Sequence, residues 1–253
     1  MTSDLQPSAP AGAKRAQHLA ATIEAEIAQR GWPIGEVLGS ETALRDRFGV
    51  SRAVLREAIR ILENHGVAEM RKGRGGGLTV RRPEITTLAR AAALHLDYER
   101  ATLDHVVDAR LALESANLEL VLSHLDDGGR VALTSHMQSE HATLATTGFA
   151  AHAHAFHRLL ARLSHNPVLV MCTEMLLDVQ QRRQRSIWPD ERVPTRFSER
   201  SVVAHQHIVD ALVAGDANAA RAALCAHLGG LSQGRATSLC QDPRSLPDDQ
   251  SAL

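Results

Sequence analysis

Apolar residues recur every three or four positions through most of the chain, which is the spacing of helices that bury one face. The first third contains three such segments, and residues typical of helix ends separate them: Lys14–Arg30, Ser40–Phe48 and Ser51–Gly66. A serine side chain accepts a hydrogen bond from the first turn of a helix, and a glycine takes the left-handed conformation that ends one. We therefore expect three helices, with a loop opened by Gly31, Pro33 and Gly35 after the first and a tight turn at Gly49 between the second and the third.

The pattern changes after the third segment. Val67–Arg71 and Leu78–Arg81 have the length of short strands, and Lys72–Gly77 between them is rich in glycine. Two short apolar segments joined by glycines predict a β-hairpin. Helices followed by such a hairpin are typical of a winged helix-turn-helix, which we place at residues 14–82.

Beyond Pro83 no strand pattern is present, and the periodicity predicts seven helices. They are Ile85–Leu96, Leu103–His124, Gly129–Ala145, Phe149–Ser164, Pro167–Ile187, Ser198–Ala214 and Ala217–Leu231. Asp127, Asn166 and Asp216 are the expected N-caps. The predicted protein is mainly α-helical, with the winged domain followed by an all-helical antiparallel bundle at residues 83–233. The polar segments 1–13 and 234–253 are expected to be a disordered leader and a flexible tail.

Charge is distributed unevenly along the chain. Residues 1–83 carry 13 lysines and arginines against 9 acidic residues, whereas the remainder carries 15 against 20. A basic first third suits contact with nucleic acid at one end of the molecule. No apolar run is long enough to cross a membrane, and the N-terminus lacks the pattern of a signal peptide, so we expect a cytoplasmic protein.

The third segment carries residues expected to face DNA. Ser51 begins it, and Arg52 and Arg56 lie four positions apart, so both project from one side of the helix. Arginine suits guanine edges and phosphates. The glycine-rich turn adds the wing candidates Lys72, Gly73 and Arg74. A charged helix face is often merely solvated, but the order of elements favours DNA binding.

Several stretches resemble the DNA-binding domain of the GntR family of bacterial regulators. They are Leu38–Glu41, Phe48–Arg52, Leu55–Ala58 and Gly73–Gly75. The resemblance implies that Ser51, Arg52 and Arg56 touch DNA together with the wing. The family often has an arginine where this chain has Thr42, so the neighbouring Arg45 is the candidate to supply that contact.

Residues 85–231 resemble the FCD domain of the FadR branch of that family. The matching positions are Arg110–Glu114, Phe156-His157, Asn166-Pro167, His205, Ile208, Ala211-Leu212, Gly215-Asp216 and His227-Leu228. Many relatives bind a divalent metal inside the bundle through one aspartate and three histidines, and an organic carboxylate often completes the coordination. The resemblance therefore implies that His157, His205 and His227 are metal ligands.

The positions of His205 and His227 support this pairing independently. They lie ten residues before and twelve after the glycine of one tight turn, so both stand roughly 15–18 Å from that turn on antiparallel helices. Imidazoles suit zinc or nickel. The family aspartate four residues before His157 is replaced here by Ala153, and His154 is the nearest candidate for a replacement ligand.

Arg110 is the candidate partner for an effector carboxylate, and a helix salt bridge with Glu114 is the alternative. The favoured function is a homodimeric repressor, not an enzyme, that binds a short inverted-repeat operator and responds to a small organic acid. A direct metal sensor is the first alternative. A metal-dependent hydrolase is the second, although the sequence contains no HExxH motif and no obvious glutamate near His157 to act as a general base.

Overall fold

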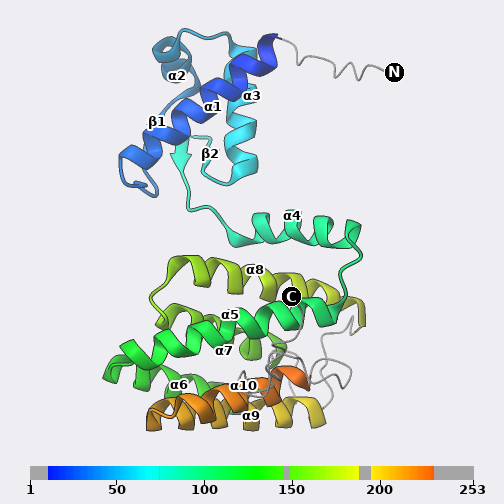
Figure 1. Ribbon diagram of the computed structural model, residues 1–253. Helices are drawn as coiled ribbons and strands as arrows, with labels where there is room; N and C mark the ends of the chain where they lie inside the picture. Colours follow the sequence, from blue (N-terminus) through cyan, green and yellow to red (C-terminus); the bar gives the residue numbers. More distant parts are fainter. Residues whose placement is uncertain (1–10, 74, 145–148, 188–194, 231–253) are drawn as a thin grey trace, which may run out of the picture. The chain divides into compact units, whose positions relative to one another are not determined.

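The computed structural model of the protein describes residues 11–73, 75–144, 149–187 and 195–230 (Figure 1). The chain divides into two compact units, Met1–Thr87 and Leu88–Leu253. The predicted tail lies outside the described residues. The predicted leader does so only up to residue 10, because the first helix already begins at Ala11 and not after residue 13.

Among its described residues, the first unit contains three complete helices and three short strands. They are α1 (Ala11–Gln29), β1 (Val37–Gly39), α2 (Glu41–Phe48), α3 (Arg52–His65), β2 (Ala68–Met70) and β3 (Leu78–Val80). Helix α1 packs on α3, and buried side chains such as Ile23, Ile27 and Leu55 belong to their common apolar core. The apolar residues of each helix recur on one face, so burying that face brings the two helices together.

The turn between α2 and α3 is fixed by caps at both helix ends. The Ser40 hydroxyl oxygen accepts a hydrogen bond from the Ala43 amide, and Ser51 accepts one from Val54. Gly49 ends α2 with φ +63°, in the left-handed region that glycine adopts without strain. These caps agree with the sequence prediction, and they hold the start of α3 at the surface.

Strand β1 was not predicted. It pairs antiparallel with β3, and the sheet has the order β1-β3-β2. A three-residue strand is too short to show a period, and its partner lies about forty positions away in the sequence. Gly77 permits the close approach of the two segments, since a Cβ atom there would stand 2.5 Å from the carbonyl oxygen of Gly39.

The second unit contains helices and no strand among its described residues. Its helices are α4 (Ile85–Tyr98, which begins just before the unit boundary), α5 (Leu103–His124), α6 (Asp127–Ala142), α7 (Phe149–Leu163), α8 (Pro167–Ile187), α9 (Thr195–Ala214) and α10 (Ala217–Gly229). The predicted fold class is therefore confirmed. Helix α6 begins earlier than predicted, because its N-cap is Asp126, which accepts a hydrogen bond from the Gly129 amide, and not Asp127.

Helix α5 packs against α7, α8 and α10, whereas α9 and α10 pack on each other across the tight Gly215-Asp216 turn (Figure 1). The core around α5 is apolar over most of its length, with Leu111, Leu118 and Phe156 buried. Polar side chains interrupt this core and build the site described below. Within the described residues, no helix combines the length and the apolar character needed to cross a membrane.

Candidate functional site

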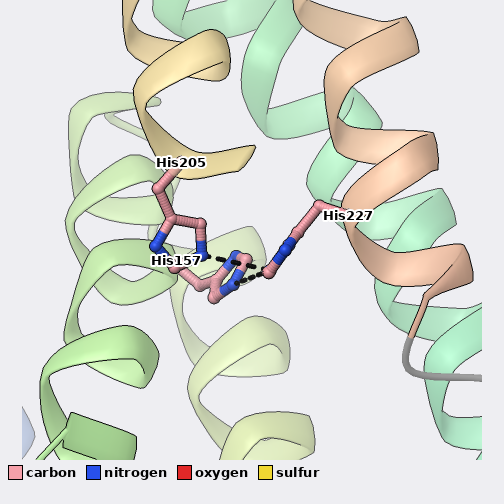
Figure 2. A group of neighbouring side chains, drawn as sticks. All are labelled: His157, His205 and His227. Carbon is pink, nitrogen blue, oxygen red and sulfur yellow. Dashed lines mark hydrogen bonds between the residues drawn. The ribbon is translucent and has the colours of Figure 1, made fainter. Parts of the chain in front are cut away.

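Three histidines from three helices meet inside the second unit (Figure 2). His157 comes from α7, His205 from α9 and His227 from α10. The Nε2 atom of His227 lies 3.2 Å from Nε2 of His157 and 3.0 Å from Nε2 of His205. All three side chains are buried, with at most 9% of His227 exposed. The structure thus brings together the three histidines that the resemblance implied.

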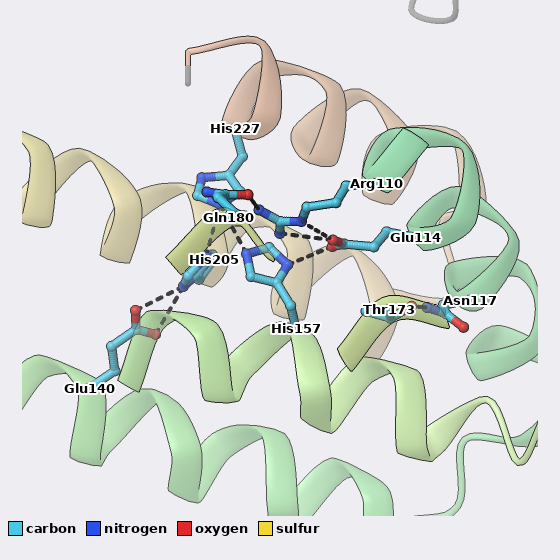
Figure 3. A network of polar contacts seen from close by, with 9 residues as sticks. All are labelled: Arg110, Glu114, Asn117, Glu140, His157, Thr173, Gln180, His205 and His227. Atoms are coloured by element: carbon cyan, nitrogen blue, oxygen red, sulfur yellow. Dashed lines mark hydrogen bonds and ion pairs between the residues drawn. The ribbon is translucent and has the colours of Figure 1, made fainter. Parts of the chain in front are cut away.

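Carboxylates contact the Nδ1 atoms of two of these rings, on the side away from the converging Nε2 atoms (Figure 3). The Nδ1–H of His157 donates to Oε2 of Glu114 at 2.5 Å. When Glu140 is ionised, the Nδ1–H of His205 donates to both of its carboxylate oxygens at 2.9 Å. A proton fixed on Nδ1 leaves Nε2 as a lone pair. Both Nε2 lone pairs therefore point to the place where His227 also presents its Nε2.

This donor set fits a divalent ion that prefers nitrogen. Nitrogen ligands at 2.0–2.1 Å from a tetrahedral zinc ion stand roughly 3.3 Å apart, close to the two distances above. The ring of His227 carries one proton when neutral, so its Nε2 cannot donate to both neighbouring lone pairs. A cation between the three nitrogens would satisfy all of them, and the carboxylates behind the rings are the usual partners of metal-binding imidazoles.

Arg110 ties this cluster to helix α8. Its side chain is 1% exposed, its Nε donates to Glu114 Oε1 at 2.8 Å, and its Nη1 donates to Gln180 Oε1 at 2.5 Å. Glu114 therefore bridges the guanidinium group and His157 (Figure 3). The Nη2 atom lies 2.8 Å from Glu114 Oε1, outside hydrogen-bond geometry, and has no other partner among the described residues.

The helix salt bridge between Arg110 and Glu114 is thus present, and it does not use every donor of the guanidinium group. Glu140 and Gln180 were not among the site residues predicted from the sequence. Each occupies the buried stripe of its helix, as Glu140 does after Leu133 and Met137. A carboxylate among the apolar residues of a buried helix face is the sequence signal that could have identified Glu140.

A cavity of about 470 Å³ lies beside the histidines, bounded by α5, α7, α8, α9 and α10. Arg110, Ala153 and His154 line it together with His157 and His227. The aspartate expected from the family would therefore stand at the cavity wall, where this chain has only a methyl group. His154 is not among the residues whose ligand atoms converge within 4.8 Å of one another, so this geometry does not place it as the fourth ligand.

Burial controls the protonation of His154 and of the three converging histidines. It lowers the pKa of His154 and His205 to about 3 and holds the pKa of His157 and His227 well below the usual range, and Arg110 acts in the same direction. All four rings are therefore neutral at physiological pH.

The buried carboxylate behind His205 shows the opposite shift. Burial raises the pKa of Glu140 to about 7, and nearby His136 opposes that shift.

The DNA-binding candidates lie on α2, α3 and the wing. Ser51 caps α3, and Arg52 is exposed and forms a 3.0 Å ion pair with Glu41. Arg56 is exposed one turn further along the same helix. Thr42, Lys72 and Gly73 are also exposed, Arg45 contacts Asp46, and Arg74 lies outside the described residues.

Comparisons with known proteins decide the family. The model of bacterial regulatory proteins of the gntR family matches residues 15–77, and the model of the FCD domain matches residues 105–230. The chain belongs to the GntR family. An Escherichia coli K12 protein, provisionally named the L-lactate dehydrogenase operon regulatory protein, is 31% identical over 216 residues, which are 81% of this chain and 80% of that one.

Other GntR relatives give the same result. The Uxu operon regulator of Haemophilus influenzae is 29% identical over 81% of this chain and 76% of its own, and the Exu regulon transcriptional regulator of E. coli is 27% identical over 84% and 81%. A solved GntR structure from Streptococcus agalactiae shares the fold, with a TM-score of 0.66 at 22% identity over 85% of this chain and 98% of that one. This GntR protein is therefore a DNA-binding transcription regulator with an FCD domain. These matches exclude the predicted alternative of a hydrolase.

The pKa shifts predict that the metal-free regulator loses stability as pH falls. The unfolded chain protonates His154, His157, His205 and His227 below about pH 6.5, whereas the folded state keeps them neutral and so binds fewer protons. The loss on going from pH 7.5 to pH 5.5 is on the order of 1 kcal/mol for each of His154 and His205, and His157 and His227 act in the same direction. Glu140 acts oppositely, since its raised pKa favours folding at lower pH, but it is one group against four.

Urea unfolding in the presence of a chelator at these two pH values measures the effect, and we expect a lower free energy of unfolding at pH 5.5. The exposed His207 supplies the control, because a His207→Gln variant should keep the full pH dependence. Equal stability at both pH values would contradict the lowered pKa values, because the folded state would then take up as many protons as the unfolded chain over this range.

Proposed function

We propose that this GntR regulator is a homodimeric repressor of the FadR branch that acts in the cytoplasm. A small organic carboxylate controls it by binding in the FCD domain, with a zinc or nickel ion held by the three histidines. The observation that carries the proposal is the convergence of three Nε2 atoms beside a cavity that also contains a buried arginine. Helix α3 and the wing would contact a short inverted-repeat operator.

The cavity offers an anion two favourable partners. A divalent ion on His157, His205 and His227 would attract a carboxylate and leave a coordination position for it. Arg110 adds a fixed positive charge in a buried setting, where an ion pair is screened less than at the surface. Two relatives are named as the Uxu operon regulator and, provisionally, as the L-lactate dehydrogenase operon regulatory protein, which supports the same kind of role here.

The DNA-binding residues Ser51, Arg52 and Arg56 would act at the N-terminal end of α3, supported by Thr42 and Arg45 on α2. Residues near this end of a recognition helix contact base edges, and wing residues contact the backbone or the minor groove. Lys72, Gly73 and Arg74 are the wing residues that we assign to this contact. The ligand would change DNA affinity by binding better to one arrangement of the two winged domains of a dimer.

An Arg52→Ala variant should weaken specific DNA binding by about 1–3 kcal/mol if the arginine contacts a base. The fold should be unaffected, because Arg52 is 71% exposed in its ion pair with Glu41 and such surface pairs contribute little. A gel-shift titration on an operator selected from random DNA measures the loss. Arg60→Ala, two turns further along α3, is the control and should cost less; equal losses would remove Arg52 from the base-reading role.

An organic acid should change operator affinity in the full-length protein only when the metal is present. Gel shifts with zinc alone, with a panel of organic acids alone, and with both together separate the possibilities. We expect the full response only with both. A full response to zinc alone would instead establish a direct metal sensor, for which the three converging histidines are sufficient.

The metal site can be tested by removing a ligand and by restoring the family aspartate. His205→Ala should abolish zinc binding, while His207→Ala, a change at an exposed histidine two residues away, should leave it unchanged. Ala153→Asp should raise affinity for divalent ions, most of all for Mn²⁺, because carboxylates suit that ion better than imidazoles do. Elemental analysis and calorimetric titration report both effects. Absence of divalent ions from the wild type and from Ala153→Asp would remove the metal from the proposal.

A further inference from the structure

His154 occupies a position that the metal site does not use. It lies on α7, 5% exposed, and lines the same cavity as Arg110 and His227. It stands three residues before His157, but its nitrogens do not join the three converging Nε2 atoms. A buried imidazole at the cavity wall therefore needs another explanation.

The His154 ring is not satisfied by the protein. Its Nδ1 atom is shielded from solvent and has no hydrogen-bond partner among the described residues. An unpaired buried polar group costs about 1–3 kcal/mol, and native structures rarely leave one without a protein, water or ligand partner. His154 lines the cavity, so a ligand there can supply that partner once the ring turns and presents the nitrogen to it.

The surroundings define the chemistry of this partner. Burial, together with the guanidinium groups of Arg110 and Arg158, lowers the pKa of His154 to about 3, so the ring is neutral. A neutral imidazole has one donor and one acceptor nitrogen, and a carboxylate could pair only with the donor. A hydroxyl group can donate to the ring or accept from it, and is the better match.

We propose that His154 recognises a hydroxyl group of the organic acid bound in this cavity, so that the site prefers hydroxy acids to unsubstituted acids of the same length. This inference rests on the proposed function, since it assumes that a carboxylate binds beside the histidines and Arg110. It assigns His154 a role in ligand specificity instead of metal binding. A site with a buried hydrogen-bonding group rejects the analogue that lacks the matching hydroxyl, because that group stays unpaired.

The inference is tested with two matched pairs of acids: L-lactate with propionate, and L-malate with succinate. Each pair differs by one hydroxyl group. Calorimetric titration of the zinc-loaded full-length protein should show about tenfold or greater preference for the hydroxy acid in at least one pair. In a His154→Leu variant this preference should fall to within about twofold while zinc affinity stays unchanged. His154→Gln, which keeps a donor and an acceptor, should restore part of it.

His207→Leu is the matched control, because His207 lines the same cavity but is exposed; it should keep the preference. If wild type and His154→Leu show the same preference, or if the two leucine variants lose it equally, the role of His154 is wrong while the proposed function stands. Loss of zinc binding in the His154→Leu variant would show that His154 is a metal ligand, and it would overturn the inference. If none of the four acids binds the zinc-loaded wild type, the organic-acid function itself fails, and the inference with it.

Discussion

The site depends on the burial of ionisable side chains inside a helical bundle. Arg110, Glu114 and Glu140 are each at most 1% exposed, and an ionised group removed from water is strongly destabilising unless a partner of opposite charge or a hydrogen bond compensates it. Each of them has such a partner, and in both carboxylates the partner includes a histidine ring. The orientation of His157 and His205 is therefore a consequence of how the bundle satisfies its buried charges.

This arrangement links α5 to α7 and α8, two helices that lie further along the sequence. Glu114 on α5 contacts His157 on α7, and Arg110 contacts Gln180 on α8 (Figure 3). A ligand or ion that binds the histidines or the guanidinium group must also perturb these contacts. Because each of them joins two helices, occupancy of the cavity bears on how the bundle packs, and this is the physical basis on which a regulator of this family could respond to a small molecule.

The sequence was most informative where structure is local. Capped helices and glycine ends are determined by neighbouring residues, so α2 and α3 were placed correctly from Ser40, Ser51 and Gly49. It failed where two adjacent residues offered the same chemistry, as at the N-cap of α6. It also failed at β1, because a short strand owes its existence to a distant partner.

For the site, the sequence by itself determined the three histidines, through the family resemblance and the spacing of His205 and His227 around one turn. It left open whether Arg110 pairs within the protein, and it could not show Glu140 behind His205 or the separation of His154 from the cluster. Those relations join helices far apart in the chain, since Glu140 and His205 are 65 positions apart. Only tertiary packing decides them, since which side chains meet in a bundle follows from which helix faces are buried against each other.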